Sequence, residues 1–176
     1  MRINLIFVLT LIFAYNADNI DGVIFKFTNF VCDIHNASWI KVHQCRLKAV
    51  KRNHITLNMN ATLLLPVNRA HVQVQFLKNS NGYKLFHYNA TIDICRFLNQ
   101  SYDPVAIMIF RQFKEFSNFN HTCPYMGNIY VKDLYLRPEL VPLPIPTGEY
   151  LLNLKWIFDK KAAITTKQYF IIEESK

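Results

Sequence analysis

The alternation of apolar and polar residues along most of this chain predicts β-strands. In residues 54–65 every odd position is apolar, whereas the even positions from Thr56 to Thr62 are polar. Successive side chains of a strand point to opposite faces of its sheet, so this segment predicts a strand with one buried and one exposed face. We expect Pro66 to end that strand.

Seven further segments share this alternation or are rich in β-branched and aromatic residues. They are residues 23–34, 40–50, 71–78, 84–95, 129–136, 149–159 and 165–172. Residues 79–82 (Asn-Ser-Asn-Gly) have the composition of a hairpin turn. The alternating prolines of residues 142–146 predict an extended connector, because proline neither donates a backbone hydrogen bond nor continues a helix.

One segment, near residues 104–116, has the apolar spacing of a helix instead. Asp103 is suited to cap the N-terminus of this helix, and Pro104 suits its first turn. Apolar residues from Val105 to Phe116 then recur three or four positions apart. About eight strands with one helix predict a mainly β fold, an antiparallel, immunoglobulin-like β-sandwich.

The first residues predict export from the cell. Arg2 precedes an apolar run at residues 5–13, and alanines follow the run. This order predicts a secretory signal peptide over residues 1–17 and a single domain over residues 18–176. An N-terminal membrane anchor is the alternative, but the run is shorter than the roughly 20 residues that a membrane-spanning helix needs. We therefore expect a secreted, extracellular protein that does not span a membrane.

The chain has four cysteines, an even number that suits two disulfides in an oxidising compartment. Four cysteines allow three connectivities. An antiparallel hairpin of residues 23–34 and 40–50 would place Cys32 opposite Cys45, so we predict that these two are bonded. Cys95 and Cys123 then form the second pair, which would fasten the helical segment to a sheet.

Five Asn-x-Ser/Thr sequences predict attached glycans, as expected for an exported protein. The acceptors are Asn36, Asn60, Asn89, Asn99 and Asn120. Asn60 and Asn89 both fall on the polar face of their predicted strands, where a sugar has room.

The net charge of +8 would suggest nucleic acid as the partner of a nuclear protein, but predicted export excludes that class. A basic surface that contacts anionic lipid or acidic glycans is one alternative. A charge that only keeps the protein soluble is the interpretation we favour.

The residue types required for catalysis do not come together in the sequence. The six histidines are scattered and form no pair at metal-ligand spacing. His121 stands two residues from Cys123, but that cysteine is expected to be in a disulfide. No nucleophile elbow, phosphate-binding loop or zinc-protease motif occurs. We therefore expect no enzymatic activity, no metal and no cofactor.

The apolar faces of the predicted strands and helix carry many large residues. If the sandwich is hollow, they line a cavity of several hundred cubic ångströms with almost no polar groups inside. The expected lining is Leu57, Met59, Leu63, Val74, Phe86, Tyr88, Met108, Ile109, Phe113, Leu152, Leu154 and Trp156. Composition does not distinguish this hollow sandwich from one with a filled core.

Several segments carry a resemblance to a known family. They are Cys32 with Cys45, residues 81–84 leading into residues 91–95, the block at residues 117–125 (Ser-Asn-Phe-Asn-His-Thr-Cys-Pro-Tyr) and residues 144–150. Over about residues 23–170 the chain resembles a large insect family of secreted four-cysteine proteins classed as a domain of unknown function. That family includes the CheB-type chemosensory proteins. Similar proteins often have a His-Asp pair where this chain has Gly127-Asn128.

The resemblance implies a hollow β-sandwich like the ML-type lipid-recognition domains, which are related to ganglioside-activator proteins. It also implies the sensing of hydrophobic pheromones. It supplies no catalytic or ligand-binding residues, because the family has no agreed ones.

We therefore expect a secreted glycoprotein that binds or presents a hydrophobic small molecule, lipid or pheromone-like, in chemosensation. A cell-surface receptor or channel would be its partner. The alternative is an extracellular protein-interaction module with a filled core and no small ligand.

Overall fold

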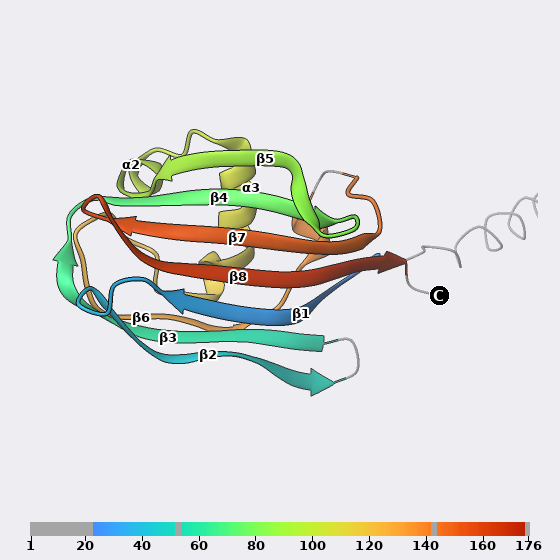
Figure 1. The fold of residues 1–176 in the computed structure, drawn as a ribbon, viewed down its shortest axis with the longest axis horizontal. Helices are drawn as coiled ribbons and strands as arrows, with labels where there is room; N and C mark the ends of the chain where they lie inside the picture. Colours follow the sequence, from blue (N-terminus) through green and yellow to red (C-terminus); the bar gives the residue numbers. More distant parts are fainter. Residues whose placement is uncertain (1–22, 52–53, 142–143, 175–176) are drawn as a thin grey trace, which may run out of the picture.

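The computed structural model describes residues 23–51, 54–141 and 144–174, so the predicted signal peptide lies outside the described residues. The described part is mainly β, with eight strands in two antiparallel sheets (Figure 1). The predicted fold class, an antiparallel β-sandwich with one principal helix, is confirmed.

The larger sheet has five strands and the smaller has three. The five-stranded sheet has the order β1 (Val23–Ile34), β8 (Lys161–Glu174), β7 (Gly148–Phe158), β4 (Ala70–Asn79) and β5 (Tyr83–Asp93). The three-stranded sheet has the order β2 (Ile40–Lys51), β3 (His54–Val67) and β6 (Tyr125–Leu134). The predicted hairpin turn joins β4 to β5, where Asn81 and Gly82 have positive φ angles of 53° and 99°. Because Asn79 pairs with Tyr83, the loop has three residues, and hairpin loops of this length commonly include a residue with positive φ, which Asn and Gly adopt readily.

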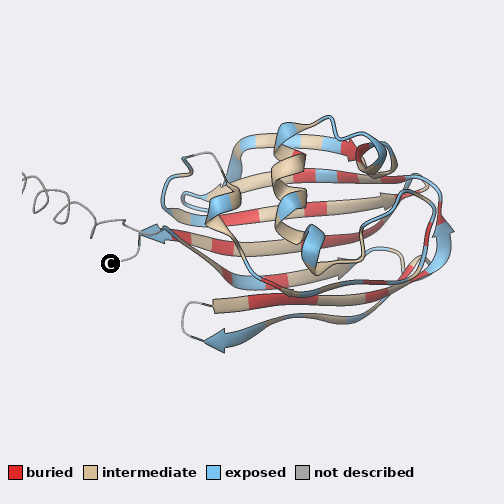
Figure 2. Cartoon of the chain, turned by 180° about the vertical axis from the view of Figure 1, so that it is seen from behind, coloured by how far each residue is buried: buried red, intermediate tan, exposed pale blue. Residues whose placement is uncertain are grey.

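The predicted helix is α3 (Pro104–Phe113), which continues into the 3₁₀ turn η1 (Lys114–Phe116). The carboxylate of Asp103 accepts a hydrogen bond of 2.8 Å from the backbone N–H of Ala106 and so caps the helix N-terminus, as the sequence predicts. In Figure 2 this helix lies across the inner face of the five-stranded sheet. Its buried Ala106 packs with residues of β4, β5 and β7.

Two short helical segments are additional to the prediction: α2 (Ile94–Asn99) and the 3₁₀ turn η2 (Pro138–Leu140). We expected a strand to run to residue 95, but β5 ends at Asp93. The reason is local, because the Asp93 carboxylate accepts a 3.0 Å hydrogen bond from the Arg96 backbone N–H and starts α2 there.

The hairpin predicted for residues 23–34 and 40–50 is wrong. β1 pairs with β8 and β2 pairs with β3, so the two strands belong to different sheets. The connection between them crosses from one sheet to the other. It is held near the start of β8, where the carbonyl of Ala163 accepts hydrogen bonds from the backbone N–H groups of His35 (2.9 Å) and Asn36 (3.1 Å).

β3 also departs from the expected pattern. The strand passes through Pro66 to Val67, and its register with β6 shifts after Leu63, which leaves Leu65 42% exposed. On its polar face Asn58 is only 8% exposed. Its Oδ1 accepts a 3.0 Å hydrogen bond from the backbone N–H of Asp133 on β6. A buried polar side chain is retained there because it is hydrogen-bonded.

The core lies between the two sheets and under α3. Phe27 and Phe30 of β1 pack with Leu57 of β3 and Leu134 of β6, and this group joins the sheets. The buried side chains alternate with exposed ones along several strands (Figure 2). The three-stranded sheet and α3 thus divide the inner face of the five-stranded sheet between them.

Candidate ligand cavity

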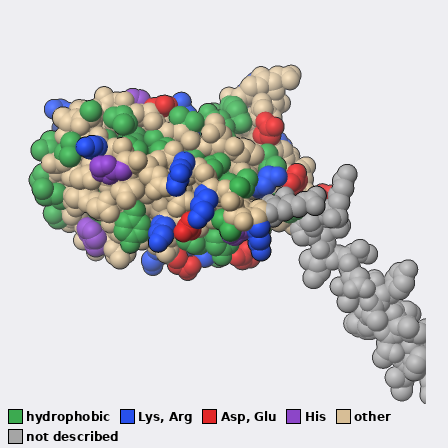
Figure 3. Space-filling view, turned by 90° about the horizontal axis from the view of Figure 1, so that it is seen from below, with side chains coloured by type: hydrophobic (Ala, Val, Ile, Leu, Met, Phe, Trp, Pro, Cys, Tyr) green, Lys and Arg blue, Asp and Glu red, His purple; other side chains and the backbone are tan. Residues whose placement is uncertain are grey.

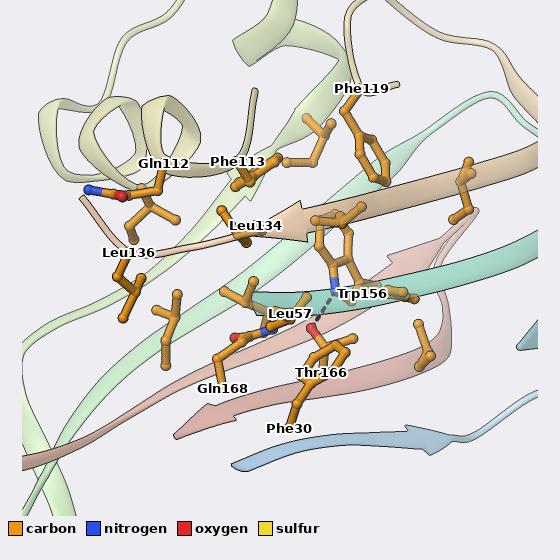
Figure 4. Close-up of a pocket in the computed structure, with 18 of the residues that line it drawn as sticks. Phe30, Leu57, Gln112, Phe113, Phe119, Leu134, Leu136, Trp156, Thr166 and Gln168 are labelled. Atoms are coloured by element: carbon orange, nitrogen blue, oxygen red, sulfur yellow. Dashed lines mark hydrogen bonds between the residues drawn. The ribbon is translucent and has the colours of Figure 1, made fainter. Parts of the chain in front are cut away.

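A cavity of about 190 Å³ lies between the five-stranded sheet on one side and the three-stranded sheet with α3 on the other. Its lining comes from both sheets, from α3 and from the connector between β6 and β7. Figure 4 shows Leu57, Leu134 and Trp156 around this space, with Phe113 and Phe119 on the side of the helix. The lining is almost wholly apolar, and no charged side chain of the described residues takes part in it.

One face of α3 supplies the wall opposite the larger sheet. Val105, Met108, Ile109 and Gln112 all line the cavity. Residues three, four and seven positions apart lie on the same side of a helix. The helical spacing read from the sequence therefore corresponds to the face that meets the cavity.

Nine of the twelve residues expected to line a cavity do line this one. They are Leu57, Met59, Leu63, Met108, Ile109, Phe113, Leu152, Leu154 and Trp156. Val74 lines a separate space of about 50 Å³ beneath α3.

Phe86 and Tyr88 of the edge strand β5 line neither space. Phe86 sits where the register of β5 with β4 shifts, and its ring packs on Phe76 and Tyr150 at centroid distances of 5.9 and 5.7 Å. Burial, followed by the nearby Asp103 carboxylate, raises the pKa of the Tyr88 phenol.

One expectation about the cavity is corrected. Its volume of about 190 Å³ is smaller than the several hundred cubic ångströms that we expected. The lining is almost wholly apolar, but it includes two amide side chains and one threonine hydroxyl that the sequence analysis did not place there, those of Gln112, Gln168 and Thr166. The register of the strands and the packing of the helix decide the volume, which is not visible in a local pattern.

Both ends of the Gln112 side-chain amide are hydrogen-bonded within the protein. Its Oε1 accepts a 3.0 Å hydrogen bond from the backbone N–H of Arg137, and its Nε2 donates a 2.9 Å bond to the Arg137 carbonyl. The Arg137 guanidinium in turn donates to the carbonyl of Arg111 (2.6 Å) and pairs with Glu115 (2.8 Å). These contacts, here called the helix clamp, fasten the C-terminal end of α3 to the chain after β6.

Thr166 is buried on β8 and is bonded to a neighbouring strand. The indole Nε1–H of Trp156 donates a 3.1 Å hydrogen bond to Thr166 Oγ1 (Figure 4). The Trp156 ring also stacks on Phe119, with centroids 6.0 Å apart. This bond holds the indole against the cavity wall.

Of the two glutamines and the threonine in the cavity wall, Gln168 is the one with a buried oxygen that has no hydrogen-bond partner among the described residues. It is half-buried on β8, and its Oε1 is shielded from solvent and has no hydrogen-bond partner among the described residues. The sequence held a signal for it, because the inward row of β8 runs Ile164, Thr166, Gln168, Phe170. Two polar residues interrupt that apolar row, and such an interruption marks a polar spot on a buried face.

Two disulfides are present, in the pairs expected from the sequence. Cys32 bonds Cys45 with a Cα–Cα distance of 6.3 Å, and Cys95 bonds Cys123 with 5.3 Å. The first joins the two sheets rather than the strands of a hairpin. The second joins α2 to the segment that precedes β6. Three of the four cysteines pack against the same buried cluster around Ile40.

The glycan acceptors differ in accessibility. Asn89, Asn99 and Asn120 are exposed. Asn36 and Asn60 are half-buried, and Asn60 Oδ1 is shielded from solvent without a partner among the described residues. Glycosylation at all five positions stays a prediction.

The charged residues lie outside, away from the cavity. Lys and Arg side chains lie close together on the face seen in Figure 3. On β2, an edge strand of the smaller sheet, Lys41, Arg46, Lys48 and Lys51 are exposed. Lysines on an edge strand discourage pairing with another chain.

Among residues 23–51, 54–141 and 144–174 no cluster of His, Cys, Asp and Glu could hold a metal ion. In the same ranges no helix is long and apolar enough to cross a bilayer.

Burial raises the pKa of the Tyr125 phenol at the cavity wall, with an opposing effect from the hydrogen bond it donates to the His121 carbonyl.

A comparison with protein families gives one match. Residues 72–152 fit the sequence profile of a family described as protein of unknown function (DUF1091). The matching segment begins in β4 and ends in β7, so it includes α3 and the Cys95–Cys123 disulfide. No curated protein matches the chain. The chain therefore contains a DUF1091 domain at residues 72–152.

Proposed function

We propose that this protein is a secreted glycoprotein that binds a hydrophobic small molecule between its two sheets and presents it to a cell-surface receptor or channel in chemosensation. The observation that carries the proposal is the apolar cavity of about 190 Å³ beneath α3. Its two disulfides are consistent with an extracellular location. The resemblance to CheB-type chemosensory proteins and to ML-type lipid-recognition domains agrees with this role.

The cavity is an energetic cost unless something fills it. Protein interiors are close-packed, with few voids larger than a water molecule. At about 24 cal/mol per Å³, an unfilled cavity of this size costs on the order of 4–5 kcal/mol of folding free energy. A ligand that occupies it restores the lost contacts and so stabilises the fold.

The volume limits the size of the ligand. An engineered apolar cavity of about 150 Å³ accepts one benzene molecule. A cavity of about 190 Å³ therefore suits one substituted ring or a short branched chain. A long, fully enclosed acyl chain would need the layers to separate, so within the hydrophobic class we favour a small, pheromone-like compound over a membrane lipid.

Binding of small aromatic compounds to protein purified from insect cells tests the proposal. Toluene and p-xylene should bind in calorimetric titrations and raise the melting temperature, whereas palmitate should bind weakly. Native mass spectrometry of the protein as purified should detect a bound small molecule. If no compound binds and no extra mass is present, the interaction-module alternative takes the place of this proposal.

A cavity-filling variant makes the test specific. Val131 on β6 lines the cavity, so Val131→Phe should abolish binding of p-xylene. In a filled core the same enlargement would cost about 1–3 kcal/mol of stability, whereas in a cavity it should cost little. Val50 on β2 is 53% exposed and lines neither cavity, so Val50→Phe, the same enlargement, is the matched control and should leave binding unchanged.

A further inference from the structure

The cavity wall includes one amide oxygen without a hydrogen-bond partner among the described residues, Gln168 Oε1. Gln168 pairs in register with Leu152 of β7, and both residues line the cavity. Figure 4 shows its side chain extending from β8 on the same side of the space as Thr166. Its Oε1 has no surface open to solvent or to the cavity in this conformation, and none of the residues that the structure describes donates a hydrogen bond to it. The terminal torsion of a glutamine side chain is soft, so a rotation of the amide is what would turn this oxygen to a ligand in the cavity.

This oxygen is unlike the other polar groups of the wall. Gln112 uses both ends of its amide on the Arg137 backbone, and Thr166 Oγ1 accepts from the Trp156 indole. A buried amide oxygen without a donor destabilises the fold, because its hydrogen bonds to water are lost on folding and no protein group replaces them. Leucine at this position would avoid the cost, since the neighbouring inward residue Phe170 is apolar.

We propose that the cavity ligand is a neutral amphiphile: one ring or short branched chain with a single hydroxyl group that donates a hydrogen bond to Gln168 Oε1. This inference rests on the proposed function and specifies its ligand class. The hydroxyl supplies the donor that the amide oxygen lacks. The apolar body of the ligand then lies against Met108 and Ile109 of α3.

The chemistry of the wall disfavours charged ligands and, less strongly, pure hydrocarbons. A charged ligand would be buried without a counter-charge, because no charged side chain among the described residues lines the cavity. A pure hydrocarbon would fill the space but would leave Gln168 Oε1 unpaired. An alcohol or phenol satisfies both conditions.

A trapped water molecule is the rival occupant. It could donate to Gln168 Oε1 and accept from the Thr166 hydroxyl, whose proton the Trp156 bond does not use. A buried water typically makes about three hydrogen bonds, and this one would have two identified partners. If water satisfies the amide, the ligand gains nothing from a hydroxyl group.

The experiment compares p-cresol with p-xylene, two rings of nearly equal size in which a hydroxyl replaces a methyl group. Dissociation constants of both are measured calorimetrically for the wild-type protein, for Gln168→Leu and for Gln73→Leu. Gln73 is exposed on β4, so its variant controls for the loss of a glutamine amide elsewhere. The measured quantity is the ratio of the two dissociation constants, in which the general hydrophobicity of each probe cancels between variants.

We expect Gln168→Leu to shift this ratio about tenfold towards p-xylene, as the loss of a buried hydrogen bond predicts, and Gln73→Leu to leave it unchanged. An unchanged ratio in Gln168→Leu, with both probes bound, overturns the inference and leaves the proposed function standing. Failure of every probe to bind the wild-type protein removes the proposed function and this inference together.

Gln168→Met is a second variant in case leucine disturbs the strand. Methionine is unbranched and adapts to irregular space, so it removes the amide with little change in shape. It should shift the ratio in the same direction as leucine. A ratio equal to that of the wild-type protein would contradict the proposed hydrogen bond.

Discussion

Cys32 on β1 and Cys45 on β2 are bonded to each other although their strands lie in different sheets. The chain between them crosses from one layer of the sandwich to the other. The disulfide therefore links the two sheets that enclose the cavity and does not join neighbouring strands of one sheet. Phe27 and Phe30, which precede Cys32 on β1, line that cavity.

Removal of the Cys32–Cys45 disulfide should destabilise the fold. The double variant Cys32→Ala and Cys45→Ala should lose about 3 kcal/mol of unfolding free energy, because the bond closes a short loop in the unfolded chain. Urea titration followed by far-ultraviolet circular dichroism measures the loss. Peptide mapping of the wild-type protein without reduction should yield Cys32 linked to Cys45, and a link to Cys95 or Cys123 would contradict the structure.

The helix clamp should contribute more through hydrogen bonds to carbonyls than through its ion pair. Arg137→Met keeps the aliphatic stem but removes the bonds to the end of α3, and we expect a loss of about 2–3 kcal/mol. The Glu115 side chain is 72% exposed, so Glu115→Gln should cost less than about 1 kcal/mol. Equal losses in the two variants, measured by urea titration, would show that the ion pair dominates.

Without ligand, Gln168→Leu should make the protein more stable. It removes the unpaired amide oxygen and places an apolar side chain in an apolar wall, for a gain of about 1–2 kcal/mol. Gln73→Leu on the exposed face of β4 should change stability by less than about 0.5 kcal/mol. A loss of stability in Gln168→Leu would mean that the amide already has a partner, such as a trapped water.

Asn89 should carry a glycan, because its side chain is exposed on the outer face of β5. Mass spectrometry of the secreted protein before and after enzymatic deglycosylation should locate a glycan there, and Asn89→Gln should lack that mass. Asn60 is the informative comparison, since its Oδ1 is shielded from solvent. Full occupancy at Asn60 would require its side chain to turn outward from the position seen here.

Local chemistry in the sequence was enough to predict most elements of the fold. Asp103 and Pro104 marked the start of α3, and the turn at residues 79–82 marked the β4–β5 hairpin. These signals are short-range: a cap or a turn depends on residues within a few positions of each other. The alternation in β7 likewise identified Leu152, Leu154 and Trp156 as inward residues.

The partners of the strands depended on tertiary structure. The sequence pattern of residues 23–34 and 40–50 suits a hairpin as well as a crossing between sheets. The spacing of Cys32 and Cys45 agrees with both, so the correct pair was predicted from a wrong geometry. β1 finds its partner β8 at the opposite end of the chain, and no local pattern encodes a pairing over that distance.

The sequence by itself determined most strands, the principal helix and the apolar character of the inner faces, because each depends on residue type and short spacing. Only the tertiary structure decided that the layers leave a cavity of about 190 Å³. A cavity is the volume that remains after distant side chains have packed, so it depends on all of them at once. The same packing closed Gln168 off from solvent and left its Oε1 without a donor among the described residues.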